Sequence, residues 1–259
     1  MADGCTVHFL DGKAPVITKA VLLERTHGLC YTEYALLHSG ITKTPLWSAE
    51  RLTDVRIKRA REISREGEFY EETGLPENDR AEFRDYRGSG WSRGHMSPSA
   101  DFSSLKTQQE SFSLANVVPQ NAENNGNLWA GIESSVRNLA VKDGELFVIT
   151  GPIFISGDLK RANGQVLIPT KLFKLVYDTK YRKAAVYIAD NADTWDYKVV
   201  SVPELERMTG IDFLPSLSLA EKSELLTLPS PKVPYKQRKK QERESYSSYG
   251  IFRLAKALI

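Results

Sequence analysis

The sequence predicts a mixed α/β fold (α+β) in which a central sheet carries helices on its faces. Apolar, β-branched segments at 145–155, 165–177 and 183–188 follow one another with polar turns between them, as the strands of a sheet core do. Residues 128–139 instead repeat apolar side chains at the spacing of an amphipathic helix. The repeating residues are Leu128, Trp129, Ile132, Val136 and Leu139.

The N-terminal part predicts further, shorter strands. Residues 6–10 and 16–23 are apolar, and Asp11-Gly12 between them is a hairpin signal. Strands are also expected at 31–38 and 47–52, before the chain enters a charged segment. Residues 1–29 are therefore expected to form an N-terminal arm with short strands.

Residues 51–72 are dense in charge and rich in arginine, with weak apolar periodicity. Two interpretations remain open for this segment. It is either a solvated helical face, which the composition favours, or a surface that contacts phosphates.

The middle and the end of the chain predict short helices. Ser97 and Pro98 resemble the N-cap and first residue of a helix, and a second short helix is expected at 104–110. A helix is expected from Val202 to about Gly210, and another at 216–226.

Composition indicates a large globular domain. The chain has 259 residues, of which 41% are hydrophobic and 26% charged, and its net charge is only +2. No apolar run is long enough to span a bilayer. The polar start at Met1 predicts no signal peptide in this chain. We expect one domain at 1–228 and a basic, flexible tail at 229–259.

Cys5 and Cys30 are the two cysteines, and neither belongs to a CxxC motif. They form either one disulfide that ties down the N-terminus or two unremarkable thiols. A disulfide would imply an oxidising compartment.

Four residues between 93 and 133 could together hydrolyse a phosphodiester. A neutral His95 suits a base that activates water near pH 7. Asn125 offers an oxygen to a hard divalent ion, and Glu133 could hold that ion's waters. Arg93 can donate to phosphate in a fixed fork. On residue types alone, the alternative interpretation is that His95 is a structural residue and that the Asn-rich segment is an ordinary turn.

The motifs in this segment resemble those of a known family. Residues 91–96, Trp-Ser-Arg-Gly-His-Met, are similar to the Asp-Arg-Gly-His signature of the DNA/RNA non-specific endonucleases. These are the ββα-metal nucleases, which include the Serratia nuclease and mitochondrial endonuclease G. Residues 115–120, Ala-Asn-Val-Val-Pro-Gln, continue the resemblance, followed by Asn125, Trp129 and Glu133 at the family's spacing.

Upstream segments add to this resemblance, which covers about residues 31–188. Residues 47–53 and 85–90 are similar to segments of endonuclease G. Several motifs in the same order make the resemblance specific, whereas Arg-Gly-His alone would be weak evidence.

The resemblance implies a role for each matching residue. His95 would be the general base and Asn125 the direct metal ligand. Glu133 would orient a metal-bound water, and Arg93 would support the phosphate or the loop. Asn116 would position the base or hold the site together.

Two positions match the family less securely. Arg65 corresponds to an upstream arginine that stabilises the transition state, or is a surface residue that forms salt bridges. Ser92 stands where the family has an acid. If that acid only orients Arg93 or the backbone, serine can replace it by hydrogen bonding. If it balances charge near the metal, activity is reduced.

The resemblance further implies a mostly antiparallel central sheet and a ββα-metal (His-Me finger) motif at about 91–139. The expected activity is a Mg²⁺-dependent endonuclease, with Mn²⁺ as a substitute, that hydrolyses DNA and RNA and leaves 5′-phosphates. The first alternative is a weakened nuclease-like module that only binds nucleic acid. The second is a nuclease specific for sequence or structure, or a toxin with an immunity partner.

Partners and location follow from this activity. We expect DNA and RNA as substrates and no membrane. The prediction also allows a homodimer and an inhibitor or immunity protein. The two cysteines, and the hazard of such a nuclease in the cytosol, lead to the hypothesis of a secreted or periplasmic protein.

Overall fold

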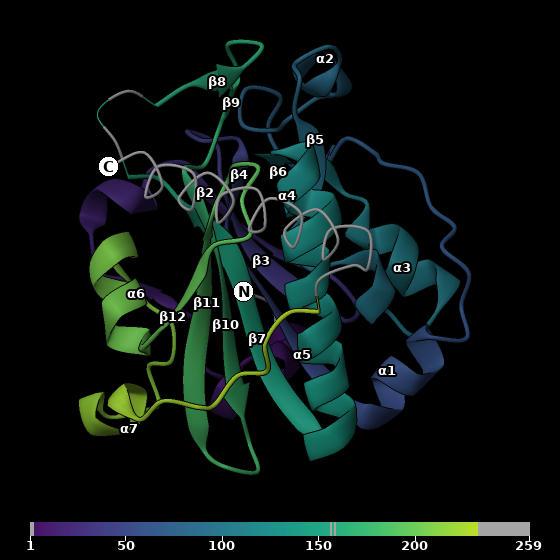
Figure 1. Ribbon diagram of the computed structural model, residues 1–259. Helices are drawn as coiled ribbons and strands as arrows, with labels where there is room; N and C mark the ends of the chain where they lie inside the picture. The colour runs from purple at the N-terminus through teal and green to yellow at the C-terminus, as the bar shows by residue number, and fades with distance from the viewer. Residues whose placement is uncertain (1–2, 156, 158, 233–259) are drawn as a thin grey trace, which may run out of the picture.

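A seven-stranded antiparallel sheet forms the centre of the protein in a computed structural model that describes residues 3–155, 157 and 159–232 (Figure 1). This confirms the expected mixed fold with a mostly antiparallel sheet. From one edge to the other the strands are β12 (Tyr197–Val200), β11 (Lys183–Asp190), β10 (Lys171–Asp178), β7 (Glu145–Ile153), β4 (Thr44–Thr53), β3 (Tyr34–Ser39) and β2 (Thr26–Cys30).

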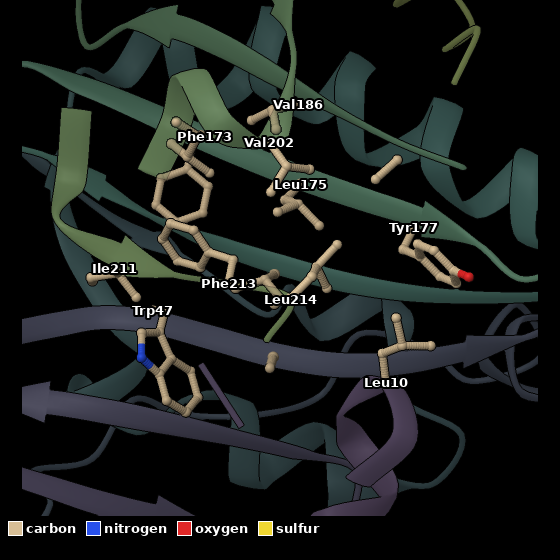
Figure 2. Packing of buried hydrophobic residues seen from close by; sticks show 14 of the residues in the cluster. Leu10, Trp47, Phe173, Leu175, Tyr177, Val186, Val202, Ile211, Phe213 and Leu214 are labelled. Atoms are coloured by element: carbon tan, nitrogen blue, oxygen red, sulfur yellow. The ribbon is translucent and has the colours of Figure 1, made fainter. Parts of the chain in front are cut away.

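Both faces of this sheet are covered, because side chains of one strand point alternately to the two faces. On one face Trp47 and Phe173 pack against Val202 of α6 (Val202–Thr209) and against Phe213, as Figure 2 shows. On the other face Val148 packs in the cluster that includes the apolar side of α5 (Ala130–Asp143). The helix α1 (Asp54–Ala60) packs beside α5. The sheet is therefore the middle of three layers.

The N-terminal strands predicted at 6–10 and 16–23 are largely wrong. The chain forms short 3-10 helices instead, because Cys5, Phe9 and Leu10 turn their side chains into the core. Phe9 meets Trp47 edge-on, with ring centroids 5.8 Å apart. The elements are η1 (Asp3–His8), η2 (Leu10–Gly12), β1 (Val16–Ile17), which pairs with β13 (Ile211–Asp212), and η3 (Ala20–Leu23).

Cys5 and Cys30 form a disulfide, with their Cα atoms 5.8 Å apart. The structure thus decides between the two alternatives for these cysteines. The bond ties η1 to β2, the edge strand of the sheet, across a sequence separation of 25.

The remaining helices differ in detail from the sequence predictions. Ser104 caps its helix as expected and accepts from the Thr107 amide at 3.1 Å, whereas Ser97 caps nothing, and Pro98 precedes a single 3-10 turn. The helix predicted up to Gly210 ends there, with φ of 74°. The other short helices are α2 (Phe83–Tyr86), η4 (Ser99–Asp101), α3 (Leu105–Ser111), η5 (Leu114–Asn116), α4 (Ala122–Asn124) and α7 (Leu219–Ser223).

A separate hairpin and the long helix form the predicted ββα unit. The strands β5 (Ser92–His95) and β6 (Val117–Gln120) pair antiparallel, with Gly94 opposite Val118. The chain then runs through α4 into α5. A second small hairpin pairs β8 (Arg161–Ala162) with β9 (Val166–Leu167), and β9 occupies the start of the segment predicted as one strand at 165–177.

The domain boundary expected at residue 228 remains a prediction. Most of the tail predicted at 229–259 lies outside the described residues, which end at Lys232. Within the part that is described, no helix combines the length and the apolar character needed to cross a membrane.

Candidate active site

A cavity of about 570 Å³ opens where the β5–β6 hairpin meets the start of the long helix. Five of the six residues predicted for the site line it: Arg65, Arg93, His95, Asn125 and Glu133. The structure thus brings together side chains from three separate parts of the chain. The catalytic roles of these residues remain predictions.

The glycine of the Arg-Gly-His motif is required by its neighbour on β6. A Cβ atom on Gly94 would lie 1.9 Å from Oε1 of Gln120, so no larger residue fits without displacing that side chain. The Gln120 amide in turn donates to Oδ1 of Asn124 at 2.8 Å. The Asn124 amide donates to the carbonyl oxygen of Asp190 at 3.1 Å. This chain of contacts fixes the hairpin relative to the helix that carries Asn125.

His95 lies between two aromatic rings. Phe69 and Phe112 each have their ring centroid 5.0 Å from the imidazole. The Arg93 guanidinium stacks over Phe69 at 4.5 Å, and that of Arg65 lies over Phe112 at 5.6 Å. The two rings therefore fix the imidazole and also hold two positive charges on either side of it.

The environment keeps His95 neutral. Burial, followed by the positive charges of Arg65 and Arg93, lowers the pKa of His95 to about 3. Its Nε2 atom is buried and has no hydrogen-bond partner within the described part of the chain. A neutral imidazole that lines the cavity can accept a proton from a water or a substrate there through its unprotonated ring nitrogen.

A π-helical turn, η6 (Asn125–Trp129), lies between Asn125 and Glu133, and both residues line the cavity. In a regular α-helix eight residues rotate by about 800°, roughly 80° beyond two full turns. One π turn absorbs about one extra residue, which brings the rotation back to about two turns. Both side chains therefore face the cavity. The sequence predicted a shared face, but not the π turn that produces it.

Glu133 lies at the wall of the cavity and is only partly exposed. Burial raises the pKa of the Glu133 carboxyl to about 7, against the opposing positive charges of Arg137 and Lys174. Arg137 also lines the cavity and donates to Oδ1 of Asp101 at 2.8 Å. Arg137 was not predicted as a site residue, although its position four residues after Glu133 on the same helix places the two side chains side by side.

Asn116, the sixth predicted residue, lies outside the cavity lining and is fully buried. Its Oδ1 accepts from the Ser97 amide and the Ser48 hydroxyl, each at 3.1 Å. Its Nδ2 donates to the carbonyl oxygens of Ser97 and Ser111, at 2.8 and 2.9 Å. Asn116 therefore holds the loop that follows His95.

The arginine-rich segment at 51–72 divides between the two interpretations. Its helix α1 stops at Ala60, and Lys58 on it pairs with Asp54 at 2.9 Å on the surface. Arg61 and Arg65, in the irregular stretch that follows, both line the cavity. The first part of the segment is thus a solvated helical face, and the second lies at the cavity, where contact with phosphate remains a prediction.

The donor atoms in the cavity fit a hard metal ion that keeps most of its waters. Asn125 offers an amide oxygen and Glu133 a carboxylate. No group of three or more His, Cys, Asp or Glu side chains that could hold a metal occurs among the described residues. Water and phosphate oxygens would therefore fill most positions around the ion.

Comparison with known proteins shows the family. The profile of the DNA/RNA non-specific endonucleases matches residues 14–220, which is more than half of the chain. This chain belongs to the DNA/RNA non-specific endonuclease family. The members of this family are hydrolases, as the sequence analysis predicted.

Relatives within the endonuclease family are named nucleases. The zebrafish (Danio rerio) mitochondrial nuclease EXOG is 31% identical over 252 residues, which cover 88% of this chain and 73% of that protein. The human counterpart is 30% identical, with 80% of this chain and 64% of that protein covered. A nuclease from Nostoc sp. is 30% identical, with 84% of each chain covered.

A solved structure supports the fold. A chain in the crystal structure of the EndoG/EndoGI complex has a TM-score of 0.69, at 22% identity. The match covers 78% of this chain and 92% of that chain.

The hypothesis of a secreted or periplasmic location is wrong. The zebrafish and human relatives, and one from Schizosaccharomyces pombe, are named mitochondrial nucleases, and the mitochondrion is an intracellular location for those proteins. A membrane-bounded compartment inside a cell separates a nuclease from the cytosol as well as export does. The danger of a nuclease in the cytosol is therefore equally consistent with export and with an enclosed compartment inside the cell. The disulfide is evidence only against a reducing compartment.

Proposed function

We propose that the protein is a metal-dependent, sugar-non-specific endonuclease that hydrolyses phosphodiester bonds of DNA and RNA and leaves 5′-phosphates. The observation that carries this proposal is the convergence in one cavity of neutral His95, Asn125, Glu133 and the two arginines Arg65 and Arg93. Contacts to phosphate and sugar carry little base information, so such a site would not select a sequence.

His95 would act as the general base. Its neutral imidazole, which lines the cavity, would accept a proton from the attacking water, and the rings of Phe69 and Phe112 prevent the imidazole from rotating away. Arg65 and Arg93 would neutralise the phosphate on either side of the imidazole. The bound phosphate offsets the charges that lower the pKa of His95, so substrate binding raises the basicity of the imidazole.

Asn125 would hold the metal ion directly, and Glu133 would hold it through water, with Mg²⁺ as the favoured ion and Mn²⁺ as a substitute. When bound, such an ion polarises the phosphate and neutralises charge that develops in the transition state. The partly buried Glu133 carboxyl has a raised pKa, so its ionisation and ion binding favour each other.

Digestion of plasmid DNA and total RNA tests this proposal. With Mg²⁺ both substrates should be degraded to a smear, and EDTA should prevent it. His95→Ala should lower the rate by roughly 10²–10⁴-fold, because it removes the base. Thermal unfolding of the variant checks that the loss is chemical. Intact substrates under every condition, from a folded parent protein, would instead support the weakened nucleic-acid-binding module.

A further inference from the structure

The short helix α2 and the β8–β9 hairpin form one surface unit beside the ββα motif (Figure 1). Tyr86 of α2 packs in one apolar cluster with Ala162 and Val166 of the hairpin and with Val117 of β6. This cluster anchors both elements to the strand that pairs with the strand carrying His95.

Hydrogen bonds hold the unit in a defined arrangement. The Asn163 side chain, at the tip of the hairpin, donates to the carbonyl oxygens of Arg84 and Arg87, at 2.9 Å each. The Arg161 guanidinium donates to the carbonyl oxygen of Ile41 at 3.1 Å. The hairpin is therefore tied to α2 on one side and to the β3–β4 turn on the other.

Four basic side chains project from this unit and a fifth, Lys43, from the adjoining β3–β4 turn, and we call the five the basic platform. Only Arg84 has a carboxylate partner within the described residues, Glu82 at 2.6 Å. The Arg161 side chain contacts carbonyl oxygens alone, so its charge is not neutralised. The basic platform consists of Lys43, Arg84, Arg87, Lys160 and Arg161, all exposed except the half-buried Lys43.

The basic platform lies within reach of the cavity along the chain. Arg87 precedes Arg93 by six residues, so their Cα atoms are at most about 20 Å apart. That span corresponds to roughly six base pairs of duplex at about 3.4 Å each. A duplex is stiff over about 150 base pairs, so a phosphate held in the cavity also fixes where the flanking phosphates lie.

We propose that the basic platform binds the phosphates of a nucleic-acid duplex that flank the bond to be cut, within about half a helical turn of the cavity. The inference rests on the proposed function, because the cavity must hold the scissile phosphate. The preferred substrate is then a duplex long enough to extend from the cavity to the basic platform. The basic platform also explains how a chain with a net charge of only +2 can bind a polyanion.

Binding of a duplex of about 20 base pairs to the His95→Ala protein in EDTA tests the platform without cleavage. Arg87→Glu with Lys160→Glu should raise Kd about tenfold and lower the slope of log Kd against log salt by roughly 2. The matched control is Lys142→Glu with Arg182→Glu, at the far end of α5 and in the β10–β11 turn. The control has the same change in net charge and should alter Kd less than about twofold.

If both double variants weaken duplex binding equally, the effect is one of net charge alone, and the proposed role of the basic platform is wrong. The proposal is also wrong if Arg87→Glu with Lys160→Glu leaves Kd unchanged. With His95 intact, the first pair should raise KM for the duplex and leave hydrolysis of bis(p-nitrophenyl) phosphate unchanged, because that substrate cannot reach the platform. If the parent hydrolyses neither substrate but the differences in Kd hold, the proposed function fails and the basic platform stands.

Discussion

At the scale of single residues, the site depends on buried polar side chains whose hydrogen bonds are complete. All four hydrogen bonds of the Asn116 amide go to the loop after His95 and to its surroundings. Asn116→Ala should lower the free energy of unfolding by about 3 kcal/mol, since it leaves several buried groups unpaired. It should also lower kcat, because the loop no longer fixes His95. Urea unfolding and kcat measured together check this, and a loss of kcat at parent stability would contradict it.

Glu133 gives a second prediction at this scale, through its protonation. Its pKa is about 7 in the folded protein and 4.5 in its ordinary state, so the native state holds the proton more tightly than the unfolded state. Ionisation therefore costs stability as the pH rises from about 4.5 to 7. In EDTA at pH 8, Glu133→Gln should be more stable than the parent by about 1–2 kcal/mol.

The two proteins should unfold alike below pH 4.5, where the parent carboxyl is also neutral. Thermal unfolding across this pH range measures the difference. Added Mg²⁺ at pH 8 should raise the Tm of the parent more than that of Glu133→Gln, because the ion favours the carboxylate. A difference in stability that is the same at every pH would contradict the raised pKa.

At the scale of elements, the π turn η6 sets the direction of Asn125. Insertion of one alanine after Gly126 should rotate Asn125 by about 100° relative to Glu133, because the π turn already accommodates its one extra residue. The fold should survive, because α5 keeps its apolar contacts, but cleavage should fall at least about a hundredfold. Gly126→Ala is the matched control: an added Cβ meets nothing within 4 Å, so activity should remain. Cleavage by the insertion variant at the parent rate would exclude a role for the direction of Asn125.

At the scale of the whole molecule, the disulfide connects the N-terminal segment to the edge of the sheet. The closed loop has a sequence separation of 25, for which loop entropy predicts a contribution of about 3 kcal/mol. Cys5→Ala with Cys30→Ala should therefore lower the Tm clearly and leave kcat at 25 °C close to that of the parent, because neither cysteine lines the cavity. Reduction of the parent by dithiothreitol should give the same shift. An unchanged Tm in both experiments would show that packing alone holds the segment.

Local patterns and motifs in the sequence were enough to predict several elements. The spacing of Ile132, Val136 and Leu139 predicted α5, because one face of a helix must repeat apolar residues at that interval to be buried. Gly210 marked the end of α6, because its left-handed conformation suits glycine. Ordered motifs also brought five of the cavity residues to attention, although they lie far apart along the chain.

By itself the sequence determined the class of fold, the family and the side chains of the candidate site, because those depend on local periodicity and on motifs. Only the tertiary structure decided the order of the strands, the 3-10 form of the N-terminal segment, the π turn below Asn125 and the aromatic rings around His95. The last three of these each depend on a partner distant in the chain: Trp47 for Phe9, Asp190 for Asn124, and Phe112 for His95. The free energy of packing such partners together exceeds the local preferences that sequence patterns report.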